Sequence, residues 1–219
     1  MKITLLCSDP MHPVNPYLKA WKDKAPAVWD VELVQEKSQA TGGDILFLIS
    51  CSEIINTKDR AQYGACLVLH ASDLPKGRGW SPHIWELANG ADTITLTLLD
   101  AEDKVDSGAI WCKFSILIPK NFLWDEINHK LFQAEVDLIN YAIENYGLIK
   151  PTMQLTNTEA TYYRRRTPED SAIDPNKTIA EQFDLIRVCD PNRFPAYFEY
   201  LGQRYLLKVE KDNEQQNCY

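Results

Sequence analysis

The sequence predicts an α/β fold: a doubly wound, mostly parallel sheet with a small β-rich appendage at its C-terminal end. Short apolar runs alternate with amphipathic helical stretches as far as Gly147, and such alternation is typical of parallel strands connected by helices. The pattern breaks at Lys150-Pro151, after which the chain changes character. Hydrophobic residues make up 45% of the 219 residues, which is enough for the core of one medium domain with an appendage.

Five apolar runs bounded by turn-forming residues predict the strands of the sheet. They are residues 2–7, 44–50, 65–69, 93–99 and 110–118. The clearest helix is predicted from Trp124 to Tyr146, because apolar residues recur on one helical face and Gly147 can end it. A shorter helix is expected to begin with Ser81 as N-cap and Pro82 in its first position.

The change at Lys150-Pro151 divides the chain into parts of unequal size. We expect a main domain over 1–150, a small domain with a β-hairpin over 151–210 and a disordered tail over 211–219. In the small domain, residues 178–188 are expected to form a helix. Two extended stretches, 197–200 and 205–209, flank Leu201-Gly202-Gln203-Arg204, which is a plausible hairpin loop.

Charge and cysteine usage argue against several classes of protein. Acidic residues outnumber basic ones by 31 to 23, for a net charge of −8, whereas nucleic-acid binding needs basic surface to neutralise phosphates. No apolar run approaches the roughly 20 residues that cross a membrane, and the run at residues 3–7 is too short for a signal peptide. The six cysteines lack zinc-binding spacing, so we expect reduced thiols, no metal and a cytoplasmic location.

The loop after the first predicted strand excludes one common use of this fold. Residues 8–16 contain no glycine, so the glycine-rich fingerprint that binds the pyrophosphate of dinucleotides is absent. The sequence also contains no phosphate-binding P-loop and no Gly-x-Ser-x-Gly nucleophile motif. A nicotinamide-dependent enzyme is therefore disfavoured.

A histidine and a carboxylate lie where predicted strands meet loops. His70 follows the apolar run at 65–69 and is itself followed by a loop rich in proline and glycine, and Asp106 precedes the run at 110–118. In open α/β sheets, ligands bind where strands end and loops begin. Either residue alone would more often be structural, but together they form a candidate acid–base couple.

The residues around this couple resemble the formyltransferase family, which transfers a formyl group from N10-formyltetrahydrofolate to an amine. The family pattern is Asn-x-His-x-Ser-Leu-Leu-Pro, then Arg-Gly-x-x-Pro, then Asp-x-Gly-x-Ile. The matching residues are His70, Ser72, Leu74, Pro75, Arg78, Gly79, Pro82, Asp106, Gly108 and Ile110. A fourth stretch, from Arg165 to Asp170 with Ile173-Asp174 after it, resembles a segment that follows the catalytic domain in several members.

The resemblance implies a Rossmann-like catalytic domain over 1–150 and N10-formyltetrahydrofolate as co-substrate. It implies that protonated His70 stabilises the developing oxyanion, and that Asp106 stabilises the imidazolium and relays or accepts the proton. The residues that align with folate-lining positions are Ser52, Glu53, Ile54, Trp80, Glu102, Asp103, Lys104, Val105 and Asp106. Trp80 can equally be an ordinary packing residue of its loop.

A second set of residues is expected to contact the acceptor amine. They are His12, Asn15, Arg78, Arg165 and Arg166. Adjacent arginines can hold a phosphate or carboxylate through paired hydrogen bonds, although an exposed arginine run is usually only a solvated surface. The stretch 184–196 resembles the branch that formylates a UDP-linked 4-amino-4,6-dideoxy sugar, a pseudaminic acid precursor. We therefore expect an N-formyltransferase for a nucleotide-linked amino sugar, without nucleic-acid or membrane partners and with a homodimer left open.

One position departs from the family pattern. Val68 stands where the family has the asparagine that helps to hold the formyl oxygen, and valine has no hydrogen-bond donor in its side chain. Losing one such donor typically lowers turnover about 10²- to 10³-fold. Two alternatives therefore stay open: formyl transfer to methionyl-tRNA or another small amine, and a non-catalytic protein that binds folate or a nucleotide sugar.

Overall fold

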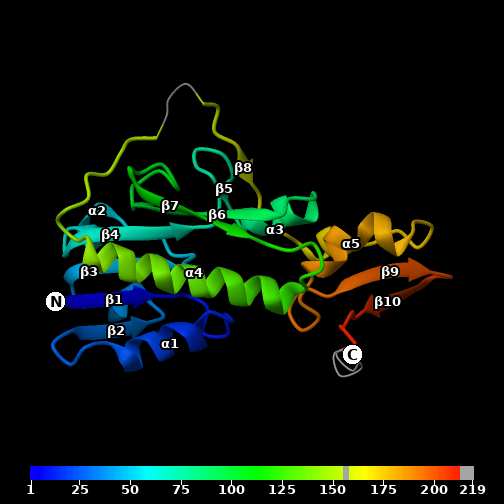
Figure 1. The fold of residues 1–219 in the computed structure, drawn as a ribbon, viewed down its shortest axis with the longest axis horizontal. Helices are drawn as coiled ribbons and strands as arrows, with labels where there is room; N and C mark the ends of the chain where they lie inside the picture. The colour runs from blue at the N-terminus through cyan, green and yellow to red at the C-terminus, as the bar shows by residue number, and fades with distance from the viewer. Residues whose placement is uncertain (155–157, 213–219) are drawn as a thin grey trace, which may run out of the picture.

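The computed structural model describes residues 1–154 and 158–212, and its centre is a six-stranded sheet with the order β2-β1-β3-β4-β6-β7 (Figure 1). The strands are β1 (Lys2–Leu6), β2 (Asp30–Val34), β3 (Gly43–Ile49), β4 (Tyr63–His70), β6 (Thr93–Asp100) and β7 (Ile110–Leu117). The first four are parallel, and β6 is antiparallel to both of its neighbours. The predicted mostly parallel sheet is confirmed.

The strand that the sequence did not predict is β2, at one edge of the sheet. Its residues Asp-Val-Glu-Leu-Val alternate between polar and apolar, and none of them is fully buried. Edge strands with one solvated face show this alternation instead of a continuous apolar run. Glu32 projects from β2 and forms an ion pair with Lys2 of β1 at 3.5 Å.

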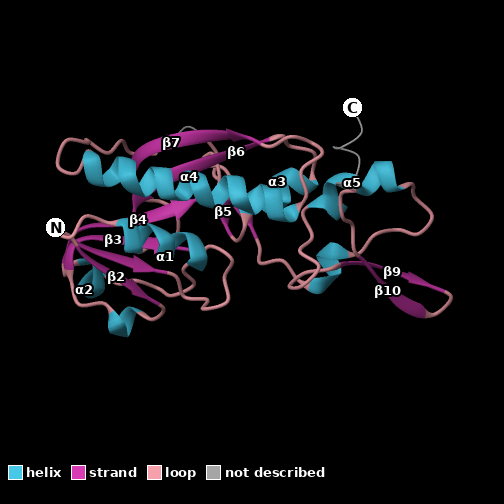
Figure 2. Cartoon of the chain, turned by 60° about the horizontal axis from the view of Figure 1, so that its bottom comes forward, coloured by secondary structure: helices cyan, strands magenta, loops and turns pink. Residues whose placement is uncertain are grey.

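Helices α1 (Asn15–Lys24) and α4 (Trp124–Glu144) cover one face of the sheet, as Figure 2 shows. The main core lies between them and the strands, with Phe47, Leu67 and Ile139 among its fully buried side chains. The short helix α2 (Thr57–Arg60) follows β3 and contacts β4. Helix α4 ends two residues before the predicted end.

The start of helix α3 (Pro82–Ala88) differs from the expectation in one respect. The helix begins at Pro82 as predicted, but Ser81 has a φ of +45° and its hydroxyl makes no capping hydrogen bond. The preceding backbone is held instead by the two-residue strands β5 (Arg78–Gly79) and β8 (Tyr162–Tyr163), which pair in parallel. Trp80 extends this pairing, since its N–H donates to the carbonyl of Tyr163 at 3.1 Å.

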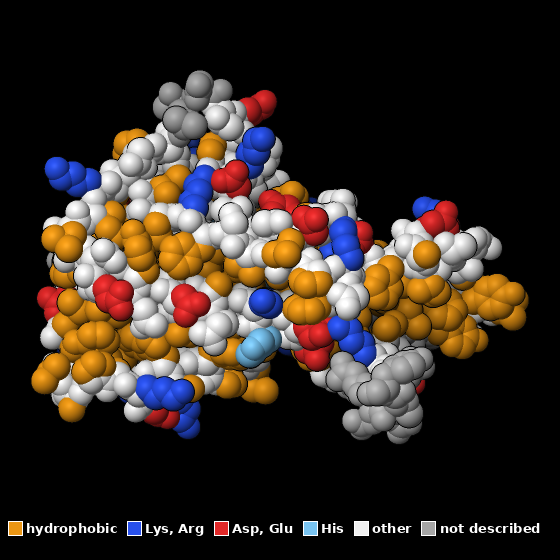
Figure 3. Space-filling model, in the orientation of Figure 1, with side chains coloured by type: hydrophobic (Ala, Val, Ile, Leu, Met, Phe, Trp, Pro, Cys, Tyr) orange, Lys and Arg blue, Asp and Glu red, His pale blue; other side chains and the backbone are white. Residues whose placement is uncertain are grey.

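The C-terminal part contains helix α5 (Ile179–Arg187) and a hairpin of β9 (Ala196–Tyr200) and β10 (Gln203–Leu207). Strand β10 begins before the predicted residue because the loop has two residues, Leu201 and Gly202, both with positive φ. Figure 3 shows hydrophobic side chains gathered on this projecting hairpin. The exposed ones include Tyr200, Leu201, Tyr205 and Leu206.

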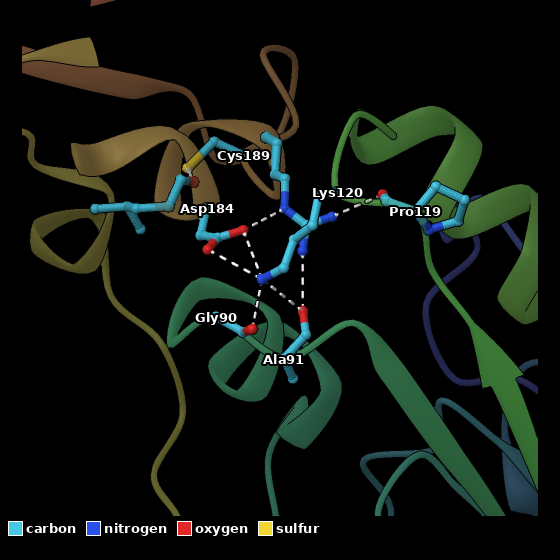
Figure 4. Close-up of polar contacts among 8 residues, drawn as sticks. Gly90, Ala91, Pro119, Lys120, Asp184 and Cys189 are labelled. Carbon is cyan, nitrogen blue, oxygen red and sulfur yellow. Dashed lines mark hydrogen bonds and ion pairs between the residues drawn. The ribbon is translucent and has the colours of Figure 1, made fainter. Parts of the chain in front are cut away.

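A buried arginine fastens α5 to the sheet domain (Figure 4). The Arg187 side chain is fully buried and donates from Nε to Asp184 at 2.8 Å, and from its other nitrogens to the carbonyls of Pro119 and Ala91. Lys120 donates to the same carboxylate of Asp184 at 3.2 Å. These bonds join α5 to the turn before β6 and to the loop before α4.

Three smaller expectations can be compared with the structure. The five cysteines within the described residues are free thiols. No helix in the described part of the chain is long and apolar enough to span a bilayer. Most of the predicted tail, residues 213–219, lies outside the described residues, whereas Lys211 forms an ion pair with Glu126 of α4 at 2.6 Å.

Glu135 of α4 is buried in the core face of the helix. It is 5% exposed, and its Oε2 has no hydrogen-bond partner among the described residues. Burial without a compensating charge raises the pKa of this carboxyl from 4.5 to about 8. The neutral acid is therefore the form that the folded core accepts.

This buried carboxyl predicts a pH-dependent stability. In the unfolded chain Glu135 ionises near pH 4.5, whereas in the folded chain it stays protonated up to about pH 8. The free energy of unfolding should therefore fall as the pH rises from about 4.5 to about 8. Glu135→Gln should flatten this dependence and stabilise the protein at pH 8, by on the order of a few kcal/mol. Urea unfolding between pH 5 and 8 measures the effect, with the exposed Glu144→Gln on the same helix as control. Parallel pH curves for wild type and Glu135→Gln would contradict it.

Candidate active site

The candidate site lies where β4 ends, at the carboxyl edge of the parallel strands. His70 is the last residue of β4 and pairs with Thr97 of β6. Leu67 and Leu69 belong to the main core beneath α4, whereas Val68 packs in a second cluster. Because side chains alternate along a strand, His70 projects to the same side as Val68.

Both nitrogens of the His70 ring face acceptor groups. Nε2 lies 2.8 Å from the carbonyl oxygen of Gly77, and Nδ1 lies 3.6 Å from Oδ1 of Asp106. The side chains of His70 and Asp106 are 8% and 7% exposed. A carbonyl only accepts, so Nε2 carries a proton.

Asp106 is held in place from two sides. Its backbone is in the left-handed region, with a φ of +51°, and its Oδ2 accepts a hydrogen bond from the N–H of Gly79 at 2.8 Å. Gln154 donates to the carbonyls of Asp106 and Gly108 at 2.8 and 3.0 Å. A Cβ at Gly108 would lie 1.9 Å from the carbonyl oxygen of Asp100, so only glycine fits there.

Gln154 was not among the predicted site residues, and no motif marks it. Its Oε1 accepts a hydrogen bond from Arg78 at 2.5 Å, and Arg78 also donates to the hydroxyl of Tyr162 at 3.1 Å. Arg78 is 6% exposed. Arg78, a predicted acceptor-binding residue, is therefore buried and contacts the side chain of Gln154, which supports the Asp106 loop. Contact of Arg78 with a substrate stays a prediction.

Most of the predicted folate-lining residues lie on two loops that Arg60 of α2 bridges, since it donates to the carbonyl of Ile55 and to Asp103. Ser52, Glu53 and Ile54 follow β3, and residues 102–105 follow β6. The loops are joined through α2, because Arg60 forms an ion pair with Asp103 at 2.7 Å. Ile54 and Val105, one on each loop, are 78% and 61% exposed. Exposed apolar side chains on adjoining loops suit a flat aromatic ring such as a pterin.

Trp80 lies on a different segment, beside one of the predicted acceptor residues. The guanidinium of Arg165 lies over its indole ring, 5.1 Å from the ring centre. Arg166 donates to the carbonyl of Asp170 and to the hydroxyl of Ser171. Residues assigned from the sequence to folate and to the acceptor thus meet on one surface.

His12 and Asn15 both shape the loop after β1. Asn15 donates to the carbonyl of Asp9 at 2.9 Å, and His12 Nδ1 accepts from the N–H of Val14 at 3.2 Å. Arg193 reaches this loop from the C-terminal part and forms an ion pair with Asp9 at 2.6 Å. Burial, together with the nearby Arg193 charge, lowers the pKa of His12 to about 4, so the ring is neutral.

His83 is a third histidine near this edge, and the sequence analysis assigned it no role. Burial, reinforced by the nearby His70 and His12, lowers its pKa to about 3. Its Nδ1 is buried and has no hydrogen-bond partner within the described residues. Nothing in the sequence around this single histidine in a short helix indicates that its side chain is buried near His70. Within the same part of the chain, no group of three or more potential ligands could hold a metal ion.

Comparison with known proteins identifies the family and the fold. The formyl transferase family model matches residues 10–143. A methionyl-tRNA formyltransferase from Clostridium thermocellum aligns at 22% identity with a TM-score of 0.79, over 93% of this chain and 90% of its own. A 4-N formyltransferase from Francisella tularensis aligns at 16% identity and a TM-score of 0.67, over 96% and 98%.

A third similar structure is the sugar 3N-formyl transferase WlaRD, in the presence of dTDP and 5-N-formyl-THF. It aligns at 18% identity with a TM-score of 0.64, over 86% of this chain and 78% of its own. These likenesses confirm the predicted fold. The family match covers more than half of the sequence, including the strand that carries His70 and the loop that carries Asp106, so this chain belongs to the formyl transferase family.

Proposed function

We propose that this protein transfers a formyl group from N10-formyltetrahydrofolate to the amino group of a nucleotide-linked 4-amino-4,6-dideoxy sugar. The observation that carries the proposal is the buried His70–Asp106 couple at the end of β4. Folate as co-substrate is supported by the exposed Ile54 and Val105 on adjoining loops and by the similar structure obtained with 5-N-formyl-THF.

The couple suits formyl transfer chemically. N10-formyltetrahydrofolate supplies the electrophilic formyl carbon, and a neutral amine attacks it, which places negative charge on the formyl oxygen. An N–H of His70 can stabilise that charge. The Nε2 proton is available for this role if His70 gives up its hydrogen bond to the Gly77 carbonyl and donates to the formyl oxygen instead. Asp106, 3.6 Å from Nδ1, stabilises the imidazolium and accepts or relays the proton that the amine loses. The bond between the formyl carbon and N10 then breaks, the formyl group stays on the amine, and tetrahydrofolate leaves with a proton on N10.

His70→Asn and Asp106→Asn should each lower kcat at least about 100-fold, because each removes an interaction of the transition state. The fold should survive, since Asn fills much of the same space at either position. Steady-state kinetics measure the loss, and circular dichroism with thermal unfolding checks the fold. Near wild-type kcat in either folded variant would contradict the assigned roles.

The acceptor is supported by charge and by the similar structures. The 4-N formyltransferase aligns over nearly the full length of both chains, and a net charge of −8 is unfavourable for tRNA. The resemblance of residues 184–196 points further, to a UDP-linked precursor of pseudaminic acid. The second candidate is methionyl-tRNA, because a methionyl-tRNA formyltransferase also aligns over most of this chain.

A panel of amines distinguishes these acceptors. We expect turnover with a UDP- or dTDP-linked 4-amino-4,6-dideoxy sugar, and none with methionyl-tRNA or with a free amino sugar. Formation of tetrahydrofolate and of the formylated product is measured for each amine. Turnover with methionyl-tRNA alone would replace the proposed acceptor, and binding without turnover of any amine would favour the non-catalytic alternative.

Because the side chain of Val68 has no hydrogen-bond donor, another group must donate to the formyl oxygen. The hydroxyl of Ser72 is fully buried and donates to the carbonyl of Lys76, and that of Ser52 pairs with Ser8. Ser50 is the remaining candidate among the serines. It follows Ile49, which pairs with Leu69, so it lies beside His70 in the strand register, and its hydroxyl has no partner within the described residues. A backbone N–H or an ordered water are the other candidates.

Val68→Asn should leave kcat unchanged or lower it, because a substitute donor already serves the oxyanion and the new amide lies against an apolar cluster. Ser50→Ala, by contrast, should lower kcat at least about tenfold if Ser50 is that donor. The measurement is kcat with the best amine of the panel. A large gain in Val68→Asn, up to about 100-fold, would mark the wild type as a weakened enzyme.

The remaining expectations about partners stay predictions. If the homodimer that the sequence leaves open forms, the hairpin is its proposed contact surface, because four large apolar side chains are exposed on it. The cytoplasmic location rests on the reduced cysteines and on the absence of a membrane-spanning run in the sequence.

A further inference from the structure

Three adjacent arginines have very different partners. Arg164 forms two ion-paired hydrogen bonds with the carboxylate of Asp170, at 2.7 and 2.5 Å. Arg166 donates to the backbone of Asp170 and to the hydroxyl of Ser171. Across residues 1–154 and 158–212, the guanidinium of Arg165 has no carboxylate and no hydrogen-bond acceptor. Arg165 is therefore the one of the three without a polar partner in the part of the chain that the structure describes.

The Arg165 guanidinium is nevertheless oriented. It lies over the indole of Trp80 at 5.1 Å from the ring centre, and Trp80 is itself 44% exposed. Stacking uses the flat face of a guanidinium and leaves the N–H groups on its edge available. We call these two residues the arginine–tryptophan site. A stacked arginine loses less freedom on binding, so it favours paired hydrogen bonds to an oxyanion.

Backbone pairing holds the arginine–tryptophan site beside the reaction centre. Gly79 pairs with Tyr163, and the N–H of Trp80 donates to the Tyr163 carbonyl, so Arg165 follows two residues after a fixed point. The N–H of Gly79 in turn donates to Asp106 at 2.8 Å. An uncompensated cation thus lies two residues after Tyr163, whose strand partner Gly79 is hydrogen-bonded to the Asp106 carboxylate, in a chain whose net charge is −8.

We propose that Arg165, oriented by Trp80, binds an oxyanion, either phosphate or carboxylate, carried by a substrate whose reacting end lies at His70. Two sources have this chemistry: the diphosphate of a nucleotide-linked acceptor and the glutamate carboxylates of folate. The identity of these two molecules rests on the proposed function, whereas the oxyanion site itself does not. Trp80 is then a platform for the arginine instead of a residue that lines the pterin.

Direct binding tests the arginine–tryptophan site without turnover. The probes are inorganic pyrophosphate, which represents the acceptor, and p-aminobenzoylglutamate, which represents the tail of folate, titrated by calorimetry into the full chain. We expect Arg165→Ala to raise the Kd of one probe at least about tenfold, the loss typical of a charge-assisted hydrogen bond. Arg165→Lys should recover only part of it, since an ammonium cannot bind bidentately.

Matched variants separate this role from a structural one. Arg204→Ala is the control, because Arg204 also lies over an aromatic ring, that of Tyr197, but has a carboxylate partner, Glu199 of the hairpin. It should leave both Kd values unchanged. Trp80→Ala should weaken the same probe as Arg165→Ala, and Trp80→Phe should retain binding. Steady-state kinetics should then show a raised KM for the corresponding substrate only.

The outcomes are distinguishable. Weakened pyrophosphate binding assigns the site to the acceptor, and weakened p-aminobenzoylglutamate binding assigns it to folate. If wild type binds neither probe, or if Arg165→Ala binds both as wild type does, the proposed site is wrong. Failure to formylate any nucleotide sugar would overturn the proposed function while leaving the probe result intact.

Discussion

The geometry of the site depends on how the carboxylate of Asp106 is held. The backbone there is in the left-handed region, which a non-glycine residue adopts at some cost. Hydrogen bonds from Gly79 and Gln154 offset that cost and fix the loop on both sides. The carboxylate can then face Nδ1 of His70 in a buried setting, where the electrostatic interaction is stronger than in water.

The elements that the sequence predicted well are those governed by local patterns. The buried strands and α4 follow from apolar runs and helical periodicity. Strand β2 was not predicted, because apolar residues in this edge strand alternate with charged ones and form no continuous apolar run. The motif around His70 and Asp106 indicated the couple, since its residues are close together in each loop. Gln154 and His83 carry no such pattern, because their positions arise from contacts between segments far apart in the chain.

The sequence also does not show which arginine side chains are available to bind an anion. From the sequence alone Arg165 and Arg166 look equivalent, and Trp80 aligns with folate-lining positions. The structure separates them by their partners: Asp170 occupies Arg164 through its carboxylate and Arg166 through its backbone, while Trp80 lies beneath Arg165. An acidic protein can therefore retain a local site for an anion, since screening at physiological ionic strength limits distant repulsion to about 8 Å.

The pairing of β5 with β8 ties the part of the chain beyond residue 150 to the loop that carries Asp106. Residues 161–163 hydrogen-bond residues 77–80, through the Thr161 hydroxyl at Gly77 and through backbone groups at the others. Gln154 supports the Asp106 loop. Residues 161–163 and Gln154 all lie beyond the first 150 residues. Residues 1–150 therefore do not hold the Asp106 loop by themselves. Exchanging the later segment for another would disturb the contact between Asp106 and His70 unless the replacement kept these hydrogen bonds.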